Sequence, residues 1–231
     1  MADFVSKALA KSTAIIRLLL PKQRKESRMS WSLYDTRGRR KYLAPKERWA
    51  FLDAALEVGG DVGTFCAVLA FSGARISEVL ALTPERIDDG NLAINFETLK
   101  RRERGIIRAV PVPLNLLHNL DDVHRYREAQ LDPMRANTRL WHWSRTTAWR
   151  RVKEVMRLAH EPEYVSKPKA LRHAFGAGAM IERVSPLLIK RWMGHAKLET
   201  TEVYSAIIGE EERTLARLTW RGAARKFQDE D

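Results

Sequence analysis

Arginine and lysine residues stand at spacings that could serve phosphate chemistry. Arg75 and Glu78 are three residues apart after a Ser-Gly-Ala turn, and far downstream Lys169 and Arg172 repeat this spacing. Residues three apart share one face of a helix, and guanidinium groups bind phosphate oxygens through paired hydrogen bonds. Both arginines also have a simple structural explanation. Arg75 and Glu78 could form a surface ion pair, which contributes little to stability, and Arg172 could take part in a structural salt bridge.

A histidine and a tyrosine follow the second pair. His195 comes directly after Gly194, and Tyr204 stands nine residues later, close to the apolar Val203. A tyrosine hydroxyl can act as a nucleophile, and an imidazole can donate a hydrogen bond to an anion. The structural alternatives are His195 as part of a helix C-terminal cap and Tyr204 as a core aromatic residue.

The motifs of several other chemistries are absent from the sequence. It has no glycine-rich phosphate loop, no His-Glu-x-x-His and no Gly-x-Ser-x-Gly. The 6 histidines stand in no zinc-binding frame, and the acidic pairs Asp88-Asp89 and Asp121-Asp122 are assigned to a surface turn and a helix start. The sequence therefore predicts no metal and no cofactor, which argues against a metal-dependent nuclease.

The composition predicts a globular, basic chain. The 231 residues are 45% hydrophobic and 30% charged, with a formal net charge of +12 and a pI near 10.1. Such an excess indicates a polyanionic partner, because clustered cations attract phosphates. Cys66 is the single cysteine, so an intrachain disulfide and cysteine-rich zinc modules are excluded, and its apolar surroundings predict a buried thiol. No apolar run is long enough to cross a bilayer, so no membrane partner is expected.

The positive charge is concentrated near the N-terminus. Residues 1–48 contain 13 Lys and Arg against 4 Asp and Glu, and apolar periodicity over Phe4–Leu20 predicts a helix. One interpretation is a solvated linker that happens to be basic. The interpretation we favour is an arm that lies along a nucleic-acid backbone. Its candidate DNA contacts are Arg37, Arg39, Arg40 and Lys41.

Periodicity and the positions of Pro and Gly predict the elements that would hold these residues. Two β-rich runs, Asn91–Phe96 and Ile106–Val112, flank a very basic turn and predict a hairpin. Asp61 is predicted to cap a helix. The expected fold class is mainly α with a small antiparallel β-sheet (α+β). Besides the N-terminal one, the predicted helices cover Pro45–Val58, Asp61–Phe71, Arg75–Leu82, Leu114–Leu131, Ser144–Ala159, Pro168–Ile181, Pro186–Met193 and Glu210–Leu218.

Taken in order, these motifs resemble the tyrosine recombinase (phage integrase) family. The resemblance covers residues 43–218, the catalytic domain of that family. It divides the chain into a basic N-terminal arm or helix (1–42), the catalytic domain (43–218) and a C-terminal tail (219–231). The matching motifs are Gly73-x-Arg75-x-Ser77-Glu78, the turn lysine Lys100, the box Lys169-Ala170-Leu171-Arg172-His173, Gly194-His195, and Tyr204 after Thr200-Thr201.

The resemblance implies a role for each matching residue. Arg75 and Arg172 would clamp a DNA phosphate, His195 would hydrogen-bond to it, and Tyr204 would attack it. Lys100 would protonate the leaving 5′-oxygen, since arginine does not release a proton at accessible pH. Two further residues would support this site: Glu78 would orient Arg75, and His173 would make a structural hydrogen bond. Additional DNA contacts are expected from Arg101, Arg102 and Arg104.

Two features depart from the family pattern. The box usually begins with histidine, and here the position is Lys169, which can donate to phosphate but cannot act as a neutral base near pH 7. In addition, only about forty residues precede the catalytic domain. In this respect the chain resembles the short fimbrial-switch invertases and some plasmid or transposon resolvases.

The function implied by the resemblance is site-specific recombination of double-stranded DNA through a covalent 3′-phosphotyrosyl intermediate. It further implies a homotetramer on DNA with two protomers per site, assisted by an accessory DNA-bending protein. The protein would lie with the DNA in the cytoplasm of a prokaryote, or would be encoded by a virus or mobile element. Apolar residues of the segment after Tyr204, such as Leu215 and Trp220, would contact a neighbouring protomer; the alternative is that this segment folds back on its own domain. The alternatives are a catalytically inactive DNA-binding accessory protein, a basic RNA-binding protein and, with the same chemistry, a type IB topoisomerase.

Overall fold

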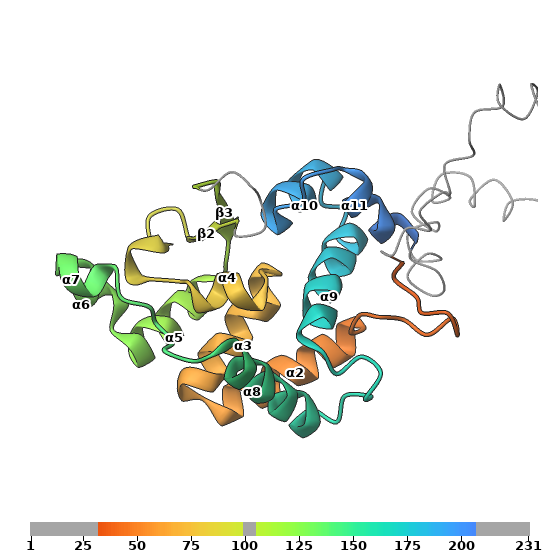
Figure 1. The fold of residues 1–231 in the computed structure, drawn as a ribbon, viewed down its shortest axis with the longest axis horizontal. Coiled ribbons are helices and arrows are strands. Elements are labelled where there is room, and N and C mark those ends of the chain that lie inside the picture. The colour runs from red at the N-terminus through yellow and green to blue at the C-terminus, as the bar shows by residue number, and fades with distance from the viewer. Residues whose placement is uncertain (1–31, 99–104, 207–231) are drawn as a thin grey trace, which may run out of the picture. The chain divides into compact units, whose positions relative to one another are not determined.

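The structure is a computed structural model that describes residues 32–98 and 105–206 (Figure 1). Among the described residues, no helix is both long and apolar enough to cross a membrane. Several predicted features lie outside the described residues: the helices 4–20 and 210–218, the turn residues Lys100, Arg101, Arg102 and Arg104, and the tail 219–231.

Helices dominate the described chain, and one small sheet accompanies them (Figure 1). The strands β1 (Ile87–Asp88), β2 (Ala93–Glu97) and β3 (Ile107–Pro111) are antiparallel in the order β1-β2-β3. The expected fold class and the hairpin are therefore confirmed. The helices are α2 (Pro45–Val58), α3 (Gly60–Ser72), α4 (Ile76–Leu80), α5 (Leu114–His124), α6 (Tyr126–Gln130), α7 (Pro133–Ala136), α8 (Arg145–Leu158), α9 (Pro168–Ile181), α10 (Pro186–Met193) and α11 (Glu199–Glu202), with 3-10 turns η1 (Pro84–Arg86) and η2 (Val203–Ala206).

Helices α2, α9 and α10 have the predicted bounds. Each begins with a proline, Pro45, Pro168 or Pro186. Proline is favoured at this position because its fixed φ suits a helix and its missing N–H would be unpaired there anyway. Ser144 caps α8, where its side chain accepts a hydrogen bond from the backbone of Thr147, as expected for a helix start.

The predicted cap at Asp61 is wrong. Helix α3 begins at Gly60, and Gly59 occupies the N-cap position without a side-chain cap. Gly59 has a φ of 61°, a left-handed backbone that glycine adopts without strain. This conformation lets one residue end α2 and start α3, so Asp61 falls inside the first turn.

The predicted helix over residues 114–131 is in fact two helices, α5 and α6. Arg125 separates them with a φ of 51°, in the left-handed region. The acidic pair Asp121-Asp122 consequently lies in the last turns of α5 and not at a helix start. Asp121 pairs with Arg127 at 3.1 Å, an interaction that holds the two helices at this corner.

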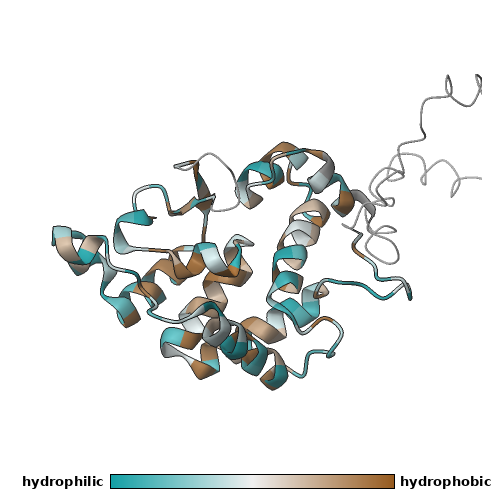
Figure 2. Ribbon diagram, viewed as in Figure 1, coloured by the Kyte–Doolittle hydropathy of each residue, from teal (hydrophilic) through white to brown (hydrophobic). Residues whose placement is uncertain are grey.

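Helix α3 forms the centre of the hydrophobic core. Residues 63–70 are all buried, and α2, α5, α8 and α9 pack around the helix. A helix that is apolar all round is expected to be enclosed in this way. Figure 2 shows hydrophobic and hydrophilic residues alternating around the other helices, as for elements with one buried face. Cys66 is completely buried, as predicted, and burial raises the pKa of its thiol.

The segment before α2 packs with this core. Leu33 and Tyr42, which the sequence placed in the arm, are buried, and a bridge between Tyr34 and Arg40 closes the turn between them. The guanidinium of Arg40 forms an ion pair with Glu47 in the first turn of α2. The described part of the predicted arm is therefore anchored to the helical domain.

Glu161 gives a testable pH dependence of stability. Its side chain is 8% exposed, and neither carboxylate oxygen has a hydrogen-bond partner among the described residues. Burial, and then the charge of Glu47, raise its pKa from 4.5 to about 7, while Arg40 opposes the shift. The folded protein therefore favours the protonated carboxyl of Glu161. This contribution to the free energy of unfolding is fully present below pH 4.5 and is lost as the pH rises through about 7.

We therefore expect Glu161→Gln to raise the melting temperature at pH 8 and to change it little at pH 4.5. Thermal denaturation of the wild type and of Glu161→Gln at the two pH values measures this difference. The contributions of the other titrating groups cancel, because both proteins share them. The exposed residue Glu163 supplies the matched control, Glu163→Gln. An equal effect of Glu161→Gln at both pH values would contradict the assignment.

Candidate active site

A glycine turn after α3 places Arg75 at the start of α4. Gly73 has a φ of 60°, and a Cβ added to it would lie 2.5 Å from Cδ1 of Phe175. Both the backbone conformation and the lack of space therefore require glycine. Arg75 follows as the N-cap residue, and its backbone N–H donates to Glu78 at 2.8 Å.

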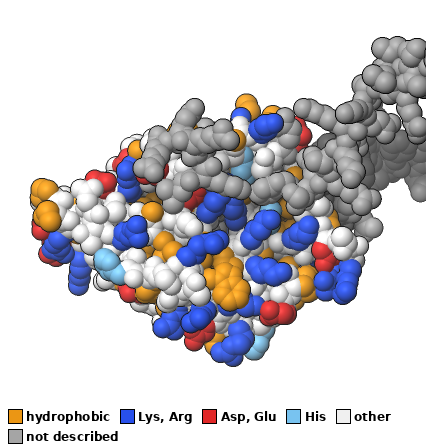
Figure 3. Space-filling view, viewed as in Figure 1, with side chains coloured by type: hydrophobic (Ala, Val, Ile, Leu, Met, Phe, Trp, Pro, Cys, Tyr) orange, Lys and Arg blue, Asp and Glu red, His pale blue; other side chains and the backbone are white. Residues whose placement is uncertain are grey.

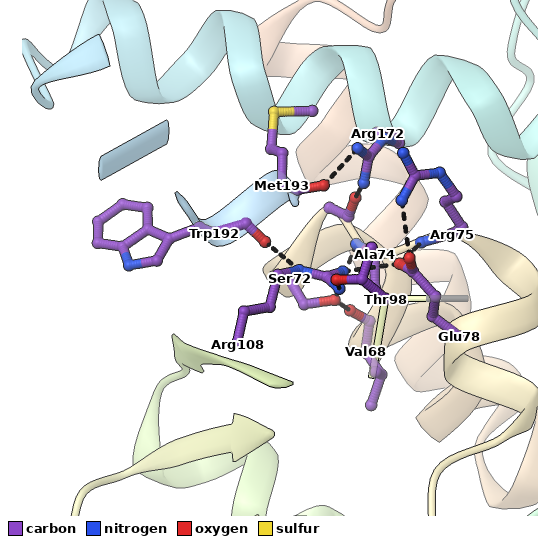
Figure 4. Close-up of polar contacts among 11 residues, drawn as sticks. Val68, Ser72, Ala74, Arg75, Glu78, Thr98, Arg108, Arg172, Trp192 and Met193 are labelled. Atoms are coloured by element: carbon purple, nitrogen blue, oxygen red, sulfur yellow. Dashed lines mark hydrogen bonds and ion pairs between the residues drawn. The ribbon is translucent and has the colours of Figure 1, made fainter. Parts of the chain in front are cut away.

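Glu78 is a buried acceptor for two arginines. Its carboxylate accepts hydrogen bonds from Nη1 of Arg75 and from Nη2 of Arg108, each at 2.7 Å (Figure 4). Although burial alone would raise it, the charge of Arg108 and the backbone N–H of Arg75 hold the pKa of Glu78 below its usual value. The alternative of a surface ion pair is wrong, because Glu78 is only 3% exposed.

Arg108 is a buried residue of this site that sequence reasoning missed. Besides Glu78, it donates to the carbonyl oxygen of Trp192 at 2.7 Å and to Oγ1 of Thr98 at 3.3 Å. It thereby joins the hairpin to α4 and α10. The sequence held one signal, because strand alternation places Arg108 on the same inward face as Val110, where a charge needs a partner.

Arg172 links the turn after α3 to the end of α10. Its guanidinium donates to the carbonyl oxygen of Gly73 at 2.7 Å and to that of Met193 at 2.5 Å (Figure 4). Burial, and then the nearby charge of Arg75, lower the pKa of Arg172 to about 9, so it remains charged at pH 7. Helix α9 thus presents a buried cation close to Arg75.

His195 follows the end of α10 and carries a neutral ring. Gly194 ends the helix with a φ of 62°, and the backbone N–H of His195 donates to Lys190, so the cap interpretation applies to its backbone. Its Nδ1 lies 2.9 Å from Oγ1 of Thr201. Burial, and then the charge of Arg172, lower the pKa of His195 to about 3. In the tautomer with the proton on Nε2, the ring keeps one donor for an anion.

Tyr204 is both a core aromatic residue and a member of this cluster. Its ring is 1% exposed and stacks on His195 with 6.3 Å between ring centroids and an interplanar angle of 12°. Its hydroxyl lies 3.4 Å from Nδ1 of His173. Burial raises the pKa of Tyr204 to about 12, against the opposing charges of Arg172 and Arg75. The phenol is therefore neutral at pH 7 and needs a base to become a nucleophile.

A basic cavity of about 290 Å³ separates the segment before α2 from the start of α9. Lys41 and Lys169 both line it, together with His173. Arg39 also lines it, over the ring of Tyr164 at 5.2 Å. The structure thus brings part of the predicted arm to the box residue Lys169. Arg40 lines the cavity as well, but its guanidinium is paired with Glu47. Arg37 is exposed, and Lys100, Arg101, Arg102 and Arg104 are outside the described residues.

The charge balance of the cluster favours an anion. Arg75 and Arg108 share a single carboxylate, Glu78, and the buried Arg172 nearby donates only to backbone carbonyl oxygens, so the cations of the cluster exceed its anions. A second cavity, of about 330 Å³, opens beside Arg108 and His195. Figure 3 shows Lys and Arg side chains gathered over the middle of one face of the molecule. Among the described residues, no group of His, Cys, Asp and Glu is arranged to hold a metal ion.

The packing of the Tyr204 ring against Gly176 can be tested by its effect on stability. A Cβ on Gly176 would overlap the Tyr204 ring, whereas a Cβ on Gly178 would lie 3.3 Å from the movable end of Arg48. We expect Gly176→Ala to destabilise the fold by about 1–3 kcal/mol through overpacking. Gly178→Ala, two residues further along the same helix, should change stability by less than about 1 kcal/mol. Urea denaturation measures both, and equal effects would contradict the tight contact.

This fold is that of the catalytic domain of a tyrosine recombinase. The chain belongs to the phage integrase family, whose sequence model matches residues 43–210. The tyrosine recombinase XerA of Pyrococcus furiosus is 29% identical over 139 residues, which are 59% of this chain and 46% of that protein. The tyrosine recombinase XerD of Mycobacterium tuberculosis is 29% identical over 148 residues, 61% of this chain and 46% of that protein. The chain spans about half the length of these curated relatives.

Solved structures share the fold. A crystal structure of XerA recombinase has a TM-score of 0.60 and 21% identity, and the match covers 77% of this chain and 62% of that one. The catalytic domain of bacteriophage HP1 integrase has a TM-score of 0.53 and 19% identity, with 78% of this chain and 95% of that one covered. At these identities the similarity concerns the fold alone.

Proposed function

We propose that this chain is a site-specific DNA recombinase that cuts and rejoins strands through a covalent 3′-phosphotyrosyl intermediate. The observation that carries the proposal is the meeting of Arg75, Arg172, His195 and Tyr204, which come from four separate segments. Membership of the phage integrase family supports the same class of activity. A covalent intermediate conserves the phosphodiester bond energy, so the reaction needs no external energy source.

In this mechanism, guanidinium groups stabilise the charge that develops on the phosphate. Arg75 and Arg172 bind the non-bridging oxygens, and His195 donates a further hydrogen bond. Glu78 holds Arg75 in position, so the donors are oriented before the substrate arrives and little reorganisation is needed. Tyr204 attacks phosphorus, and the 5′-oxygen leaves.

Two lysines complete the proposed mechanism. Lys100 protonates the leaving 5′-oxygen as a general acid. Lys169 donates a charged hydrogen bond to the phosphate, since a lysine ammonium carries three donors and no acceptor.

The proposed partner is double-stranded DNA bound by four protomers, two at each site. Two structural relatives were solved with DNA: XerH recombinase bound to its difH substrate, and the Tn1549 transposon integrase in complex with transposon right end DNA. We assign residues 43–218 to catalysis, residues 1–42 to backbone contacts and the tail 219–231 to assembly, with a DNA-bending protein as an accessory. The recombination integrates, excises, inverts or resolves a DNA segment. It takes place in the cytoplasm of a prokaryote, or the enzyme is encoded by a virus or mobile element.

Trapping of a covalent adduct tests the proposal. A duplex enriched from a random-sequence library by the wild-type chain (the selected duplex) is nicked at successive positions, so that the cleaved end diffuses away. We expect a protein–DNA adduct that survives denaturing electrophoresis at one nick position. Tight binding without an adduct at any position would instead favour the catalytically inactive DNA-binding protein.

A further inference from the structure

Helix α9 places an imidazole beside the Tyr204 hydroxyl. His173 directly follows Arg172, and Gly176 lies one turn further along the helix. The Tyr204 ring rests against the backbone at Gly176, where a side chain would overlap it. From this position its hydroxyl oxygen lies 3.4 Å from Nδ1 of His173. Catalytic hydrogen bonds are often this long before substrate binds.

The other nearby groups are poor acceptors for the hydroxyl proton. The ring of His195 is stacked parallel to the Tyr204 ring, and its Nδ1 is already engaged with Thr201. Arg172 has no acceptor atom, and neither has the ammonium of Lys169. Among the described residues around Tyr204, His173 is therefore the one that presents an imidazole nitrogen to the hydroxyl.

The surroundings of His173 keep its imidazole neutral until an anion arrives. Burial, and then the charges of Lys169, Arg172 and Lys41, lower its pKa to about 3, so at pH 7 a lone pair is free to accept a proton. A DNA phosphate entering among these cations would offset their charge. An offset of this kind raises the pKa of the imidazole, so the base becomes stronger as the substrate binds.

His173 also lines the basic cavity beside the start of α9. The cavity of about 290 Å³ is lined by His173 together with Lys41, Lys169 and Tyr164. Tyr204 contacts the imidazole through Nδ1. The ring thus connects the buried hydroxyl to a basic cavity in which a phosphate oxygen can be accommodated.

We propose that His173 is the general base of the reaction, the role that Lys169 cannot fill. The proposal rests on the proposed function. In the cleavage step the Tyr204 O–H bond breaks and its proton moves to Nδ1 of His173. The Tyr204 oxygen forms a bond to phosphorus, the P–O5′ bond breaks, and the 5′-oxygen takes a proton from Lys100. In the rejoining step the 5′-oxygen forms a bond to phosphorus and gives its proton back to Lys100. The bond between phosphorus and the Tyr204 oxygen breaks, and the imidazolium returns its proton to that oxygen.

A substitution that keeps an acceptor but removes basicity tests this role. In His173→Asn, the amide oxygen occupies roughly the place of Nδ1 and cannot take up a proton. We expect adduct formation on the nicked selected duplex to slow by about 100-fold or more. The exposed residue His142 supplies the matched control, His142→Asn, which should react at the wild-type rate. Melting temperatures show whether each variant is folded.

A more acidic phenol separates a base from a residue with only a structural role. Incorporation of 3,5-difluorotyrosine at position 204 gives a nucleophile that ionises without help. It should restore most of the rate lost in His173→Asn, because a structural defect would not respond to the acidity of the phenol. His173→Gln, with the same rescue, replaces His173→Asn if the latter fails to fold.

The outcomes separate the two proposals. If both His173 variants form the adduct as fast as the wild type does, the role of His173 is overturned and the proposed function stands. A slow His173 variant that difluorotyrosine does not rescue also overturns it, in favour of a structural role. Absence of an adduct from the folded, DNA-bound wild type overturns the proposed function and the base together.

Discussion

Tyr204→Phe is expected to abolish covalent attachment of the chain to DNA while leaving affinity for the selected duplex nearly unchanged. The substitution removes one hydroxyl, and affinity comes mainly from phosphate contacts spread over the basic surface. The aromatic ring keeps its place between His195 and the backbone at Gly176. Loss of the long hydrogen bond to His173 should change stability by about 1 kcal/mol or less.

Denaturing electrophoresis of the nicked duplex measures attachment, and a gel-shift titration measures affinity. Tyr126→Phe is the matched control, because Tyr126 lies on α6, where its hydroxyl donates to Asp89, outside the proposed site. It should form the adduct at the wild-type rate. Recovery of a 3′-phosphotyrosyl adduct from Tyr204→Phe would show that another residue is the nucleophile.

Arg172→Lys has the second largest expected effect, a loss of about 100- to 1,000-fold in the cleavage rate, equivalent to about 3–4 kcal/mol of barrier. A lysine supplies a point charge and cannot reproduce the planar fork of donors. Here that fork already donates to the carbonyl oxygens of Gly73 and Met193, so a single ammonium cannot hold both carbonyls and a phosphate. Arg75→Lys should lose activity for the same reason, with less effect on folding because Arg75 is partly exposed.

Two measurements separate catalysis from folding for Arg172→Lys. The melting temperature reports the loss of the two carbonyl contacts, and single-turnover adduct formation below that temperature reports the chemistry. Arg150→Lys, at an exposed position on α8, is the control and should match the wild type in both. A folded Arg172→Lys protein that cleaves at nearly the wild-type rate would exclude Arg172 from the phosphate clamp.

Local signals were sufficient for most of the helices. Pro45, Pro168 and Pro186 begin helices wherever the prediction placed them, because the preference of proline for a first turn is a property of its own ring. The prediction was wrong where a residue other than glycine took a left-handed conformation, as Arg125 does. The neighbouring Arg127 pairs with Asp121 and with the distant Asp89 at this corner, and no local pattern reports the second of these contacts.

The site shows the same division. The order and spacing of Arg75, Arg172, His195 and Tyr204 were enough to predict a common site through family resemblance. The role of Arg108 was not predictable from spacing, because its partners Glu78 and Trp192 are remote in sequence and meet only through the packing of β3 against α4 and α10. Burial turns these contacts into a single network, since each buried charge must find a partner.

By itself, then, the sequence determined the class of fold, the excess of positive charge and the set of side chains proposed to react, all of which depend on residue type and short-range order. Only the tertiary structure decided the surroundings of those side chains. It buried Tyr204 against Gly176, brought its hydroxyl to Nδ1 of His173, and surrounded that imidazole with Lys41, Lys169 and Arg172. The pKa of a group and the partner for its proton depend on desolvation and on charges from distant segments, and these arise only when the chain has folded.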